Sequence, residues 1–476
     1  MPKRFIRPQV LVGFALAASA LSGAMTASAQ GEPVAQPPAP EARDADIQRL
    51  EEQIRSLQDQ VNQLKQAPSQ PKPTLDASQV QKIVEDRLKQ QKPTAGWQDG
   101  FFIQSPDGNF KLRVGGYVQT DFRAFLAKGA TAVDNFTLRR VRPILEGTLY
   151  KNVGFRLMPD FGEGKTVLQD AYLNLTLRPE AQLRAGKFKE PLSLERLQSG
   201  TDLLFPERSV TNNLAPNRDV GIQLSGDVAR GTITYALGGF NGVADGGSSD
   251  GDGGTDKDLA WRVFAQPWRN KQGSPLQSLG FGVAGTYGGR EESLSSVAYK
   301  TAGRTTFFRY DPAAVGIGTQ TRLAPQLYYY AGPFGLLGEY ITSHQSAQKG
   351  ATRASLSNHG WFAQVSYVLT GEKAGYKSVV PSKPFDLDSH QWGAWELAVR
   401  YAVTQIDPKA FALGLSDPST SAGQAKAWTL GVNWYLNKAV KVQLNWERTD
   451  FDRAIKIGST KPSHEDLFAS RFQVAF

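Results

Sequence analysis

The sequence contains no cysteine, only four histidines, and no long apolar run beyond its N-terminal region. The lack of cysteine excludes disulfide frameworks, cysteine-ligated zinc, iron–sulfur clusters and thiol nucleophiles. The lack of apolar runs of about 18 residues excludes a multispanning helical membrane protein. No two of His344, His359, His390 and His464 stand at the spacing of a helical metal site. We therefore expect no metal and no cofactor.

Glycine, aromatic residues and charge are abundant instead. The 476 residues include 47 Gly, 25 Phe, 15 Tyr and 9 Trp, and 54 Lys+Arg stand against 45 Asp+Glu, for a formal charge of +9. Hydrophobic residues make up only 40% of the chain. This composition leaves two classes: a soluble all-β protein, or a β-barrel whose membrane-facing residues are hidden in an alternating pattern.

Residues 1–29 have the three parts of a secretory signal peptide. Lys3, Arg4 and Arg7 form the basic start of the segment. Leu11–Leu21 is a short apolar core, and Ala27-Ser28-Ala29 follows the small-x-small cleavage pattern. The alternative, an uncleaved membrane anchor, needs about 20 apolar residues, more than this core contains. We expect export and cleavage after Ala29, which removes three basic residues and leaves a net charge of +6.

Three further segments precede the strands. Residues 30–44 are rich in Pro and Ala and predict a stiff spacer. Residues 45–66 predict a coiled coil that helps copies of the chain to associate, the alternative being a lone solvated helix. Residues 67–96 predict a Pro-rich linker with a short helix. The apolar seam of the coiled coil consists of Ile47, Leu50, Ile54, Leu57, Val61 and Leu64.

From about Asn109 the apolar residues recur at every second position, which is typical of strands with one apolar face. Segments of roughly 10 such residues, joined alternately by short turns and long polar loops, indicate an outer-membrane barrel. The strand that ends at Phe476 has the alternation and terminal aromatic residue of an outer-membrane assembly signal. We predict an all-β membrane protein in which residues 97–476 form an antiparallel transmembrane β-barrel of about 16 strands. The soluble alternative is a β-sandwich or propeller, but the polar faces carry too many charges for a dry core.

Basic residues outnumber acidic ones on the predicted lumen face of the first five strands. An excess of lysine and arginine in a pore favours anions, and arginine can bind phosphate oxygens with two parallel hydrogen bonds. The alternative is that such charges are generic to water-filled barrels. Arg139 has the wrong parity for the lumen, but a β-bulge could redirect it, and Pro143 indicates local irregularity. The inward basic residues are Lys111, Arg113, Arg123, Arg140, Arg142, Arg156, Arg178 and Arg184, against Asp121, Glu146, Asp160 and Asp170.

Two long loops carry many charged residues. The loop Glu190–Arg218 carries Arg196, Arg208 and Arg218, and we expect it to fold inward and narrow the pore, although a surface loop is the plainer interpretation. The Asp- and Gly-rich stretch Asn241–Asp258 lacks the spacing of an EF-hand, so we expect a flexible surface loop there.

Several motifs in the predicted barrel are weak individually and specific in combination. Over about residues 100–476 they resemble the phosphate-selective porin O and P family. That resemblance implies a 16-stranded homotrimeric outer-membrane porin with a ladder of arginines that draws anions to a constriction. The motifs include Phe136-Thr137-Leu138-Arg139-Arg140-Val141-Arg142, Gly186-Lys187-Phe188-Lys189-Glu190-Pro191, Asn217-Arg218-Asp219-Val220-Gly221, Gly393-Ala394-Trp395-Glu396-Leu397 and Asn433-Trp434-Tyr435-Leu436-Asn437.

The resemblance also assigns roles to single residues. Arg139 and Arg140 match the paired arginines of the ladder. Arg142 matches a position that resembles an aromatic constriction residue in the phosphate-specific members of the family. The loop Glu190–Arg218 contains no lysine, whereas those members place a lysine there to bind phosphate. Both departures speak against tight phosphate specificity. The predicted pore-lining residues are Arg113, Arg139, Arg140, Arg142, Arg156, Arg184, Lys187 and Lys189, with Arg196, Arg208 and Arg218 on the constriction loop.

These observations together predict a passive channel for small inorganic anions in the outer membrane of a Gram-negative bacterium, with phosphate or polyphosphate as the solute. We expect the protein not to be an enzyme and to bind no nucleic acid. We expect it to contact outer-membrane lipid, to form a homotrimer and to have its coiled coil in the periplasm. Two alternatives stay open: a broad solute porin without charge preference, and a structural tether that acts through the N-terminal coiled coil.

Overall fold

The structure, a computed structural model, describes residues 40–66, 76–126, 132–251 and 256–476. The predicted signal peptide (residues 1–29), most of the predicted spacer and residues 67–75 of the linker lie outside the described residues. The chain divides into two compact units, Met1–Glu85 and Asp86–Phe476, which are described separately. None of the helices in the described ranges is long and apolar enough to cross a membrane.

Two helices precede the strands. α2 spans Pro40–Gln66 and α3 spans Ala77–Gln91. α2 starts inside the segment predicted as a spacer, because proline is well tolerated at the first helical position and the residues after Pro40 can continue the helix. The seam residues Leu50, Ile54 and Leu57 are each more than half exposed. The apolar stripe of α2 is therefore uncovered in the single chain.

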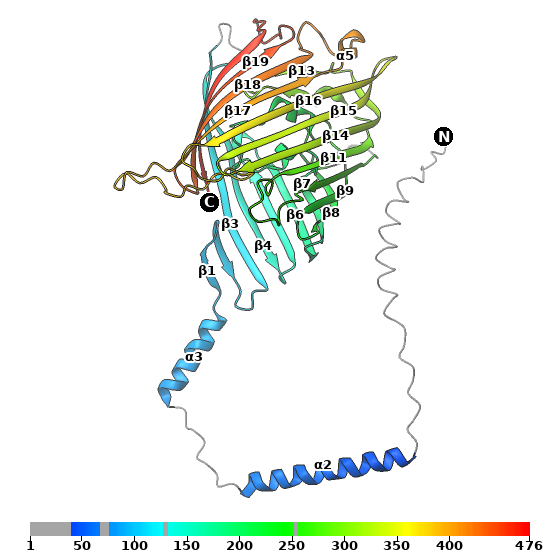
Figure 1. The fold of residues 1–476 in the computed structure, drawn as a ribbon. Coiled ribbons are helices and arrows are strands. Elements are labelled where there is room, and N and C mark those ends of the chain that lie inside the picture. The colour runs from blue at the N-terminus through cyan, green and yellow to red at the C-terminus, as the bar shows by residue number, and fades with distance from the viewer. Residues whose placement is uncertain (1–39, 67–75, 127–131, 252–255) are drawn as a thin grey trace. The chain divides into compact units, whose positions relative to one another are not determined.

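Sixteen of the strands in the described residues close into an antiparallel barrel, which confirms the predicted fold and strand count (Figure 1). Each strand pairs with the next along the chain, and the last pairs with the first. The strands are β3 (Phe110–Phe125), β4 (Asn135–Leu149), β5 (Val153–Asp160), β6 (Val167–Arg178), β7 (Ala181–Lys189), β8 (Arg218–Val228), β9 (Ile233–Phe240), β10 (Asp258–Ala265), β11 (Gly280–Gly289), β14 (Val315–Ala331), β15 (Phe334–Lys349), β16 (Thr352–Val368), β17 (Ala394–Gln405), β18 (Gln424–Tyr435), β19 (Val440–Phe451) and β20 (His464–Ala475).

β3 closes the barrel along its length. Its second half pairs with β20, from Tyr117 to Phe125. The C-terminal Phe476 continues this pairing, since its N–H donates to the carbonyl of Gly116 at 2.9 Å and its carbonyl accepts from the Gly116 N–H at 2.7 Å. The first half of β3 pairs instead with a hairpin of β1 (Thr94–Trp97) and β2 (Phe101–Gln104).

The wall is polar on the inside and apolar on the outside, as the alternation predicts. In β18, Thr429 and Asn433 are buried, whereas Trp428 and Leu430 are about half exposed at 50% and 47%. Aromatic rings gather at two levels on the outer face: Trp428 contacts Tyr401, and Trp434 stacks on Trp395 at 5.2 Å. Trp428 and Trp434 are separated along β18 by roughly 20 Å, which suits two interfacial girdles around an apolar band.

Three inward-folded loops fill much of the lumen. Residues 190–217 connect β7 to β8 and contain α4 (Leu194–Leu197) and a 3-10 turn, Val210–Leu214. Residues 290–314 connect β11 to β14 and contain a second, two-stranded sheet of β12 (Ala298–Lys300) and β13 (Thr306–Arg309). Residues 241–251 also turn inward and bury Val243 and Asp245, so the expectation of a flexible surface loop is wrong for this part of Asn241–Asp258.

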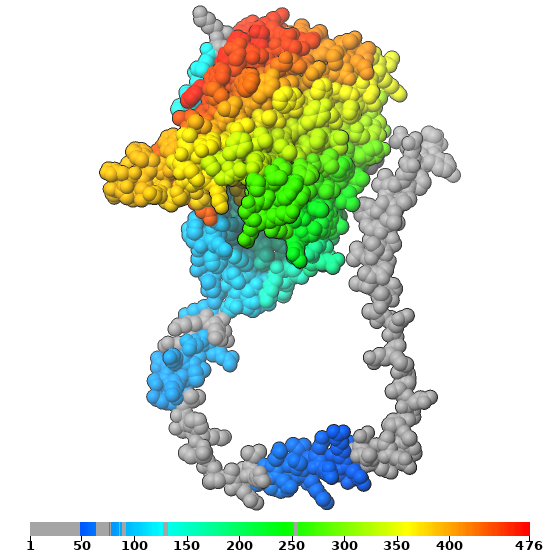
Figure 2. All heavy atoms as spheres, in the orientation of Figure 1, coloured from blue at the N-terminus to red at the C-terminus, as the bar shows by residue number. Residues whose placement is uncertain are grey.

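The largest apolar core lies within the barrel unit, formed by these loops and the wall. Leu192 and Leu214 of the first loop pack in one cluster with Tyr299, Phe307 and Phe308 of the second. The cluster also includes residues of the wall strands β11, β14 to β16, β18 and β19 and of the connection between β17 and β18. By contrast, much of the connection between β16 and β17 projects from the barrel, as the yellow-orange segment in Figure 2 shows.

The backbone of β6 lies so close to Gly186 in β7 that a side chain there would clash with it. The φ of Gly186, +126°, is a conformation that residues with a side chain rarely adopt. A Cβ atom at this position would lie 2.2 Å from the carbonyl oxygen of Ala171 and 2.8 Å from the Cα of Tyr172, both in β6. Only glycine fits here without displacing the neighbouring backbone.

Replacing Gly186 with alanine is expected to destabilise the folded barrel by about 1–3 kcal/mol, because the substitution adds strain at a positive φ and a clash with β6. The measurement is the temperature at which the folded band converts to the unfolded band in SDS gel electrophoresis. Gly239→Ala in β9 is the matched control, since its Cβ would meet nothing within 4 Å. Equal conversion temperatures for the two variants would contradict the prediction.

Candidate functional site

A cavity of about 430 Å³ lies between the inward loops and the wall. Its lining includes residues of β4 and β5, the turn after β5, the loop 190–217, residues 244–247 and the segment 296–304 that contains β12. Ten basic side chains and four acidic side chains line it. The basic ones are Arg139, Arg140, Arg142, Lys165, Lys189, Arg196, Arg208, Arg218, Lys300 and Arg304, and the acidic ones are Asp160, Glu163, Glu207 and Asp245.

A β-bulge brings both paired arginines to this cavity. In the β3–β4 ladder Gln119 lies opposite Arg140 and Thr120 lies opposite Leu138, so Arg139 is the extra residue. The bulge overcomes the strand parity that would otherwise point Arg139 away from the lumen. Arg139 donates to the carboxylate of Glu207 through Nε at 2.6 Å and Nη2 at 3.1 Å, and Arg140 contacts the same carboxylate at 3.5 Å.

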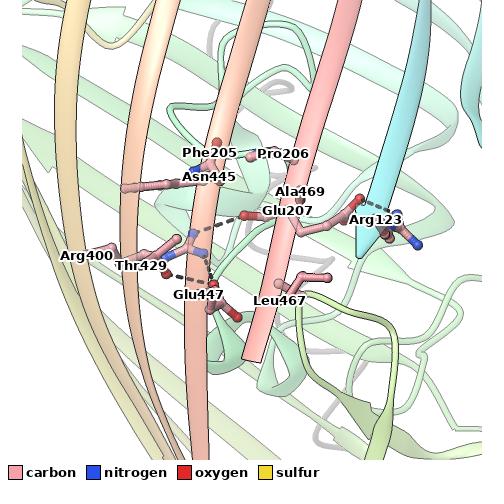
Figure 3. A pocket seen from close by; sticks show the side chains of 11 residues that line it. Arg123, Phe205, Pro206, Glu207, Arg400, Thr429, Asn445, Glu447, Leu467 and Ala469 are labelled. Carbon is pink, nitrogen blue, oxygen red and sulfur yellow. Dashed lines mark hydrogen bonds and ion pairs between the residues drawn. The ribbon is translucent and has the colours of Figure 1, made fainter. Parts of the chain in front are cut away.

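Glu207, on the inward loop, holds four arginines together. Besides Arg139 and Arg140, it lies 3.3 Å from Arg471 and 3.6 Å from Arg123. Figure 3 shows Arg123 close to Glu207. Burial by itself would raise the pKa of Glu207, but the charges of Arg139, Arg140 and Arg471 outweigh it and hold the pKa well below its ordinary value. Glu207 is therefore ionised and acts as a fixed internal anion among these arginines.

Most other arginines of the early strands are also paired with acids. Arg142 donates to Asp160 at 2.8 Å and to the hydroxyl of Tyr117 at 2.8 Å. Arg156 contacts Glu146, which also accepts from Arg113. Arg218 pairs with Asp170 at 2.7 Å. These ion pairs hold strands and loop ends together. Each carboxylate also neutralises part of the positive charge that its arginine would otherwise present to a solute.

Five cations of the cavity have no carboxylate within ion-pair distance among the described residues. Lys165 and Lys300 are two of them, and the other three, Lys189, Arg196 and Arg208, lie at the loop 190–217. Lys189 Nζ donates to the carbonyls of Leu197 at 3.2 Å and Gln198 at 2.9 Å. Arg208 Nη2 donates to the same Gln198 carbonyl at 2.7 Å. Arg196 Nη2 donates to a backbone carbonyl, that of Asn212, at 2.8 Å.

The protonation of the two arginines in this group follows from burial and mutual repulsion. Burial, followed by the charge of Arg208, lowers the pKa of Arg196 to about 9. Burial lowers the pKa of Arg208 to about 10, although the charge of Glu195 acts in the opposite direction. Both values lie above neutral pH, so both guanidinium groups are charged under physiological conditions.

The loop that carries these residues is fastened to the far wall. Arg400 of β17 donates through Nη1 to Glu195 at 3.2 Å and to the backbone carbonyl of Glu207 at 3.0 Å. Its Nη2 donates to Glu447 of β19 at 3.2 Å, and its guanidinium lies over the ring of Phe205, as Figure 3 shows. The loop therefore crosses the lumen and has a fixed position.

Seven of the eleven predicted site residues line the cavity: Arg139, Arg140, Arg142, Lys189, Arg196, Arg208 and Arg218. The other four do not. Arg113 and Arg156 share Glu146, Arg184 lies over the ring of Tyr172 at 4.4 Å, and Lys187 pairs with Asp250.

Sequence reasoning missed three basic residues of the lining, Lys165, Lys300 and Arg304. Lys165 belongs to the β5–β6 connection, and the other two belong to the loop 290–314. The signal that could have identified this loop is its apolar content, since Tyr299, Phe307 and Phe308 are unusual in a surface loop and are fully buried here.

Comparison with known proteins places the chain in a family. The family described as "Phosphate-selective porin O and P" matches residues 112–476. Porin O of Pseudomonas aeruginosa is 25% identical to this chain over 414 residues, which cover 79% of this chain and 91% of that protein. The outer membrane channel DcaP of Acinetobacter baumannii matches with a TM-score of 0.50 at 10% identity, over 79% of this chain and 99% of that one, a likeness of fold alone. The chain therefore belongs to the phosphate-selective porin O and P family and is an outer-membrane porin.

Proposed function

We propose that the protein is a passive channel for anions. The observation that carries this proposal is the cavity lining, in which ten basic side chains face four acidic ones. An ion that enters a narrow pore loses part of its water shell, and fixed charges of opposite sign offset that cost. The wall around the lumen is surrounded by apolar material of low dielectric constant, which strengthens the field of uncompensated charges inside it.

Phosphate or polyphosphate is the solute that we propose for this channel. Guanidinium groups match the oxygens of phosphate with parallel hydrogen bonds, and seven of the ten basic residues of the cavity are arginines. The family description supports the same choice. Glu190–Arg218 contains no lysine, so Arg196 and Arg208 of this loop would take the place of the family's lysine, with a different shape and hydration.

The segments before the barrel also have proposed roles. We propose that residues 1–29 are a cleaved signal peptide and that the helix within residues 45–66 forms a periplasmic coiled coil in a homotrimer. The exposure of Leu50, Ile54, Leu57 and Val61 supports association, because an apolar stripe of this length is covered by packing against further helices.

Ion selectivity is the direct test. In a planar bilayer with a KCl gradient, the purified protein is expected to show a reversal potential close to that of chloride, because the cavity favours anions. A reversal potential near zero would instead identify a broad solute porin. A value near that of potassium would overturn the proposal.

The inward loop is expected to set the width of the pore, so loosening it should enlarge and destabilise the open channel. Arg400→Met leaves the buried carboxylates of Glu195 and Glu447 without this partner, and breaking a buried ion pair in this way costs about 3–5 kcal/mol. We expect a larger and noisier single-channel conductance in concentrated KCl. Arg448→Met is the control, because the Arg448 side chain is 40% exposed and its ion pairs with Asp450 and Asp466 are expected to contribute little stability. Unchanged conductance and noise in the Arg400 variant would show that the loop is held without it.

Deletion of residues 30–92 separates a channel from a tether. The deletion ends before β1, so the barrel strands are preserved. We expect unchanged single-channel conductance and a lower temperature of trimer dissociation in SDS gels, since only the helices are lost. A tether would instead lose its attachment of the outer membrane to cell-wall material, measured as vesicle release by cells that carry the deletion. Loss of conductance would contradict the assignment of the channel to the barrel.

A further inference from the structure

A buried acid lies where the inward loop leaves the wall. Glu190 is the first residue of the loop 190–217, and its side chain is fully buried. Neither of its carboxylate oxygens has a hydrogen-bond partner among the described residues. A buried carboxylate without partners is costly when it is ionised, so proteins usually pair or protonate such a group. Glu190 needs an explanation of its own, because it does not line the cavity either.

The charges that act on Glu190, together with their ion-pair partners, form a group that is here called the acid cluster. Its acids are Glu190, Asp219 of β8, Asp245 of the connection after β9 and Asp258 of β10, and its bases are Arg290, which follows β11, and Arg322 of β14. Four acids against two bases leave two negative charges in excess if every group is ionised. Glu292, whose side chain is 44% exposed, adds a further acid at the edge of the cluster, 3.7 Å from Arg290.

The two arginines of the acid cluster are already engaged by carboxylates. Arg290 donates to Asp258 through both terminal nitrogens, from Nη1 at 2.7 Å and from Nη2 at 2.6 Å. Arg322 donates from Nε to Asp245 at 2.7 Å, and its Nη1 lies 3.8 Å from Asp258. Lys189, the base next to the loop in sequence, donates to backbone carbonyls instead. Within the described residues, these bases leave no ion-pair partner for the remaining acids of the cluster.

Backbone groups solvate Asp219, but they do not solvate Glu190. Asp219 Oδ1 accepts from the N–H of Val220 at 2.7 Å, and its Oδ2 accepts from the N–H of Gly242 at 2.6 Å. Two such bonds stabilise an ionised carboxylate. In the part of the chain that the structure describes, no three acidic or histidine side chains are arranged to hold a metal ion. A bound proton is then the remaining means of neutralising Glu190. Burial, followed by the charge of Asp258, raises the pKa of Glu190 to about 8.

The position of Glu190 connects its protonation to the inward loop. Two residues later, Leu192 is fully buried in the apolar core that joins this loop to the loop 290–314. The carbonyl of Leu192 also accepts from Gln326 of β14. An ionised Glu190 would be repelled by Asp258 and Asp219 and would lack hydration, so it would favour a position nearer to water. Movement to such a position would draw Leu192 and the start of the loop away from the wall.

We propose that Glu190 is a pH-sensitive attachment of the inward loop. It carries a proton while the loop is packed against the wall, and its ionisation in alkaline solution releases the start of the loop into the lumen. This inference concerns the regulation of the pore and rests on the proposed channel. It requires no change in the residues that line the cavity.

The first test compares the folding equilibrium of the unmodified protein and of Glu190→Gln, by urea titration in lipid vesicles at several pH values. The unfolded chain loses the proton of Glu190 near its ordinary pKa of 4.5, whereas the folded chain keeps it until about pH 8. The proton therefore favours the folded state most below pH 4.5, and this advantage is lost as the pH rises to 8. Relative to Glu190→Gln, the folding equilibrium constant of the unmodified protein should fall up to about tenfold per pH unit over this range.

The second test measures single-channel current in KCl on both sides of pH 8. The current of the unmodified protein should become larger and noisier as the pH rises through 8, because the start of the loop is released. Glu190→Gln cannot ionise and should keep the same conductance and noise throughout. Asp219→Asn removes a neighbouring negative charge, which makes ionisation of Glu190 easier, so it should move the transition to lower pH.

Glu292→Gln is the matched control. It removes a carboxylate from the edge of the acid cluster, but this carboxylate is partly exposed and has Arg290 as a partner. The transition in current and noise should persist in this variant. Folding of every variant is checked by the heat-induced band shift. If Glu190→Gln does not fold, the shift of the transition in Asp219→Asn carries the test, and an unshifted transition there overturns the inference.

The outcomes separate this inference from the proposed function. A reversal potential near that of potassium overturns the anion channel, whereas the urea titration does not depend on ion selectivity. If the channel prefers chloride but Glu190→Gln keeps the alkaline transition of the unmodified protein, the channel stands and the attachment is wrong. The attachment is equally wrong if the folding equilibria of the two proteins run parallel between pH 4.5 and 8.

Discussion

A bilayer offers the backbone no hydrogen-bond partners, so every peptide group inside it must be paired within the protein. Here the pairing of β20 with β3 meets this requirement, and the bonds between Phe476 and Gly116 extend it to the last residue of the chain. A closed wall also has only two faces. Since charged residues are costly against lipid, nearly all charge of the strands must be accommodated in the lumen.

Charged side chains in the lumen must be paired with opposite charges or hydrated. The inward loops determine which of these side chains have a carboxylate partner. Glu207 neutralises much of the paired arginines, and Asp160 and Asp170 do the same for Arg142 and Arg218. Where the loop presents carbonyl oxygens in place of carboxylates, as it does to Lys189 and Arg208, the basic side chain has no fixed carboxylate partner among the described residues. Selectivity then depends on a few places of incomplete compensation and only weakly on the net charge of the chain.

Apolar packing decides where the solute can pass. The cluster around Tyr299, Phe307 and Phe308 fills part of the lumen, and Leu192 and Leu214 join the loop 190–217 to it. The same loop is held by Arg400 against the opposite wall. The cavity that β4 and β5 share with the loops is where the basic residues of β4 and of the loop meet. Packing and electrostatics therefore act on the same segment: the loop that narrows the lumen also supplies two of its uncompensated cations.

Local patterns in the sequence were sufficient to predict the strands that form the barrel wall. The period of two, the alternation of turns with long loops and the terminal phenylalanine determine a barrel of 16 strands, because each depends only on neighbouring residues and on the requirement for closure. The irregular parity around Arg139 and Pro143 also indicated the bulge that the structure places there. The tertiary structure alone decided which cations are free. Arg140 with Glu207 and Arg218 with Asp170 are pairs between residues 67 and 48 positions apart, and no local pattern records such a meeting. Compensation of charge depends on distances in space. The alternation in the sequence therefore indicated which faces of the strands are polar, and folding of the loops determined which cations line the cavity and which of them have a carboxylate partner.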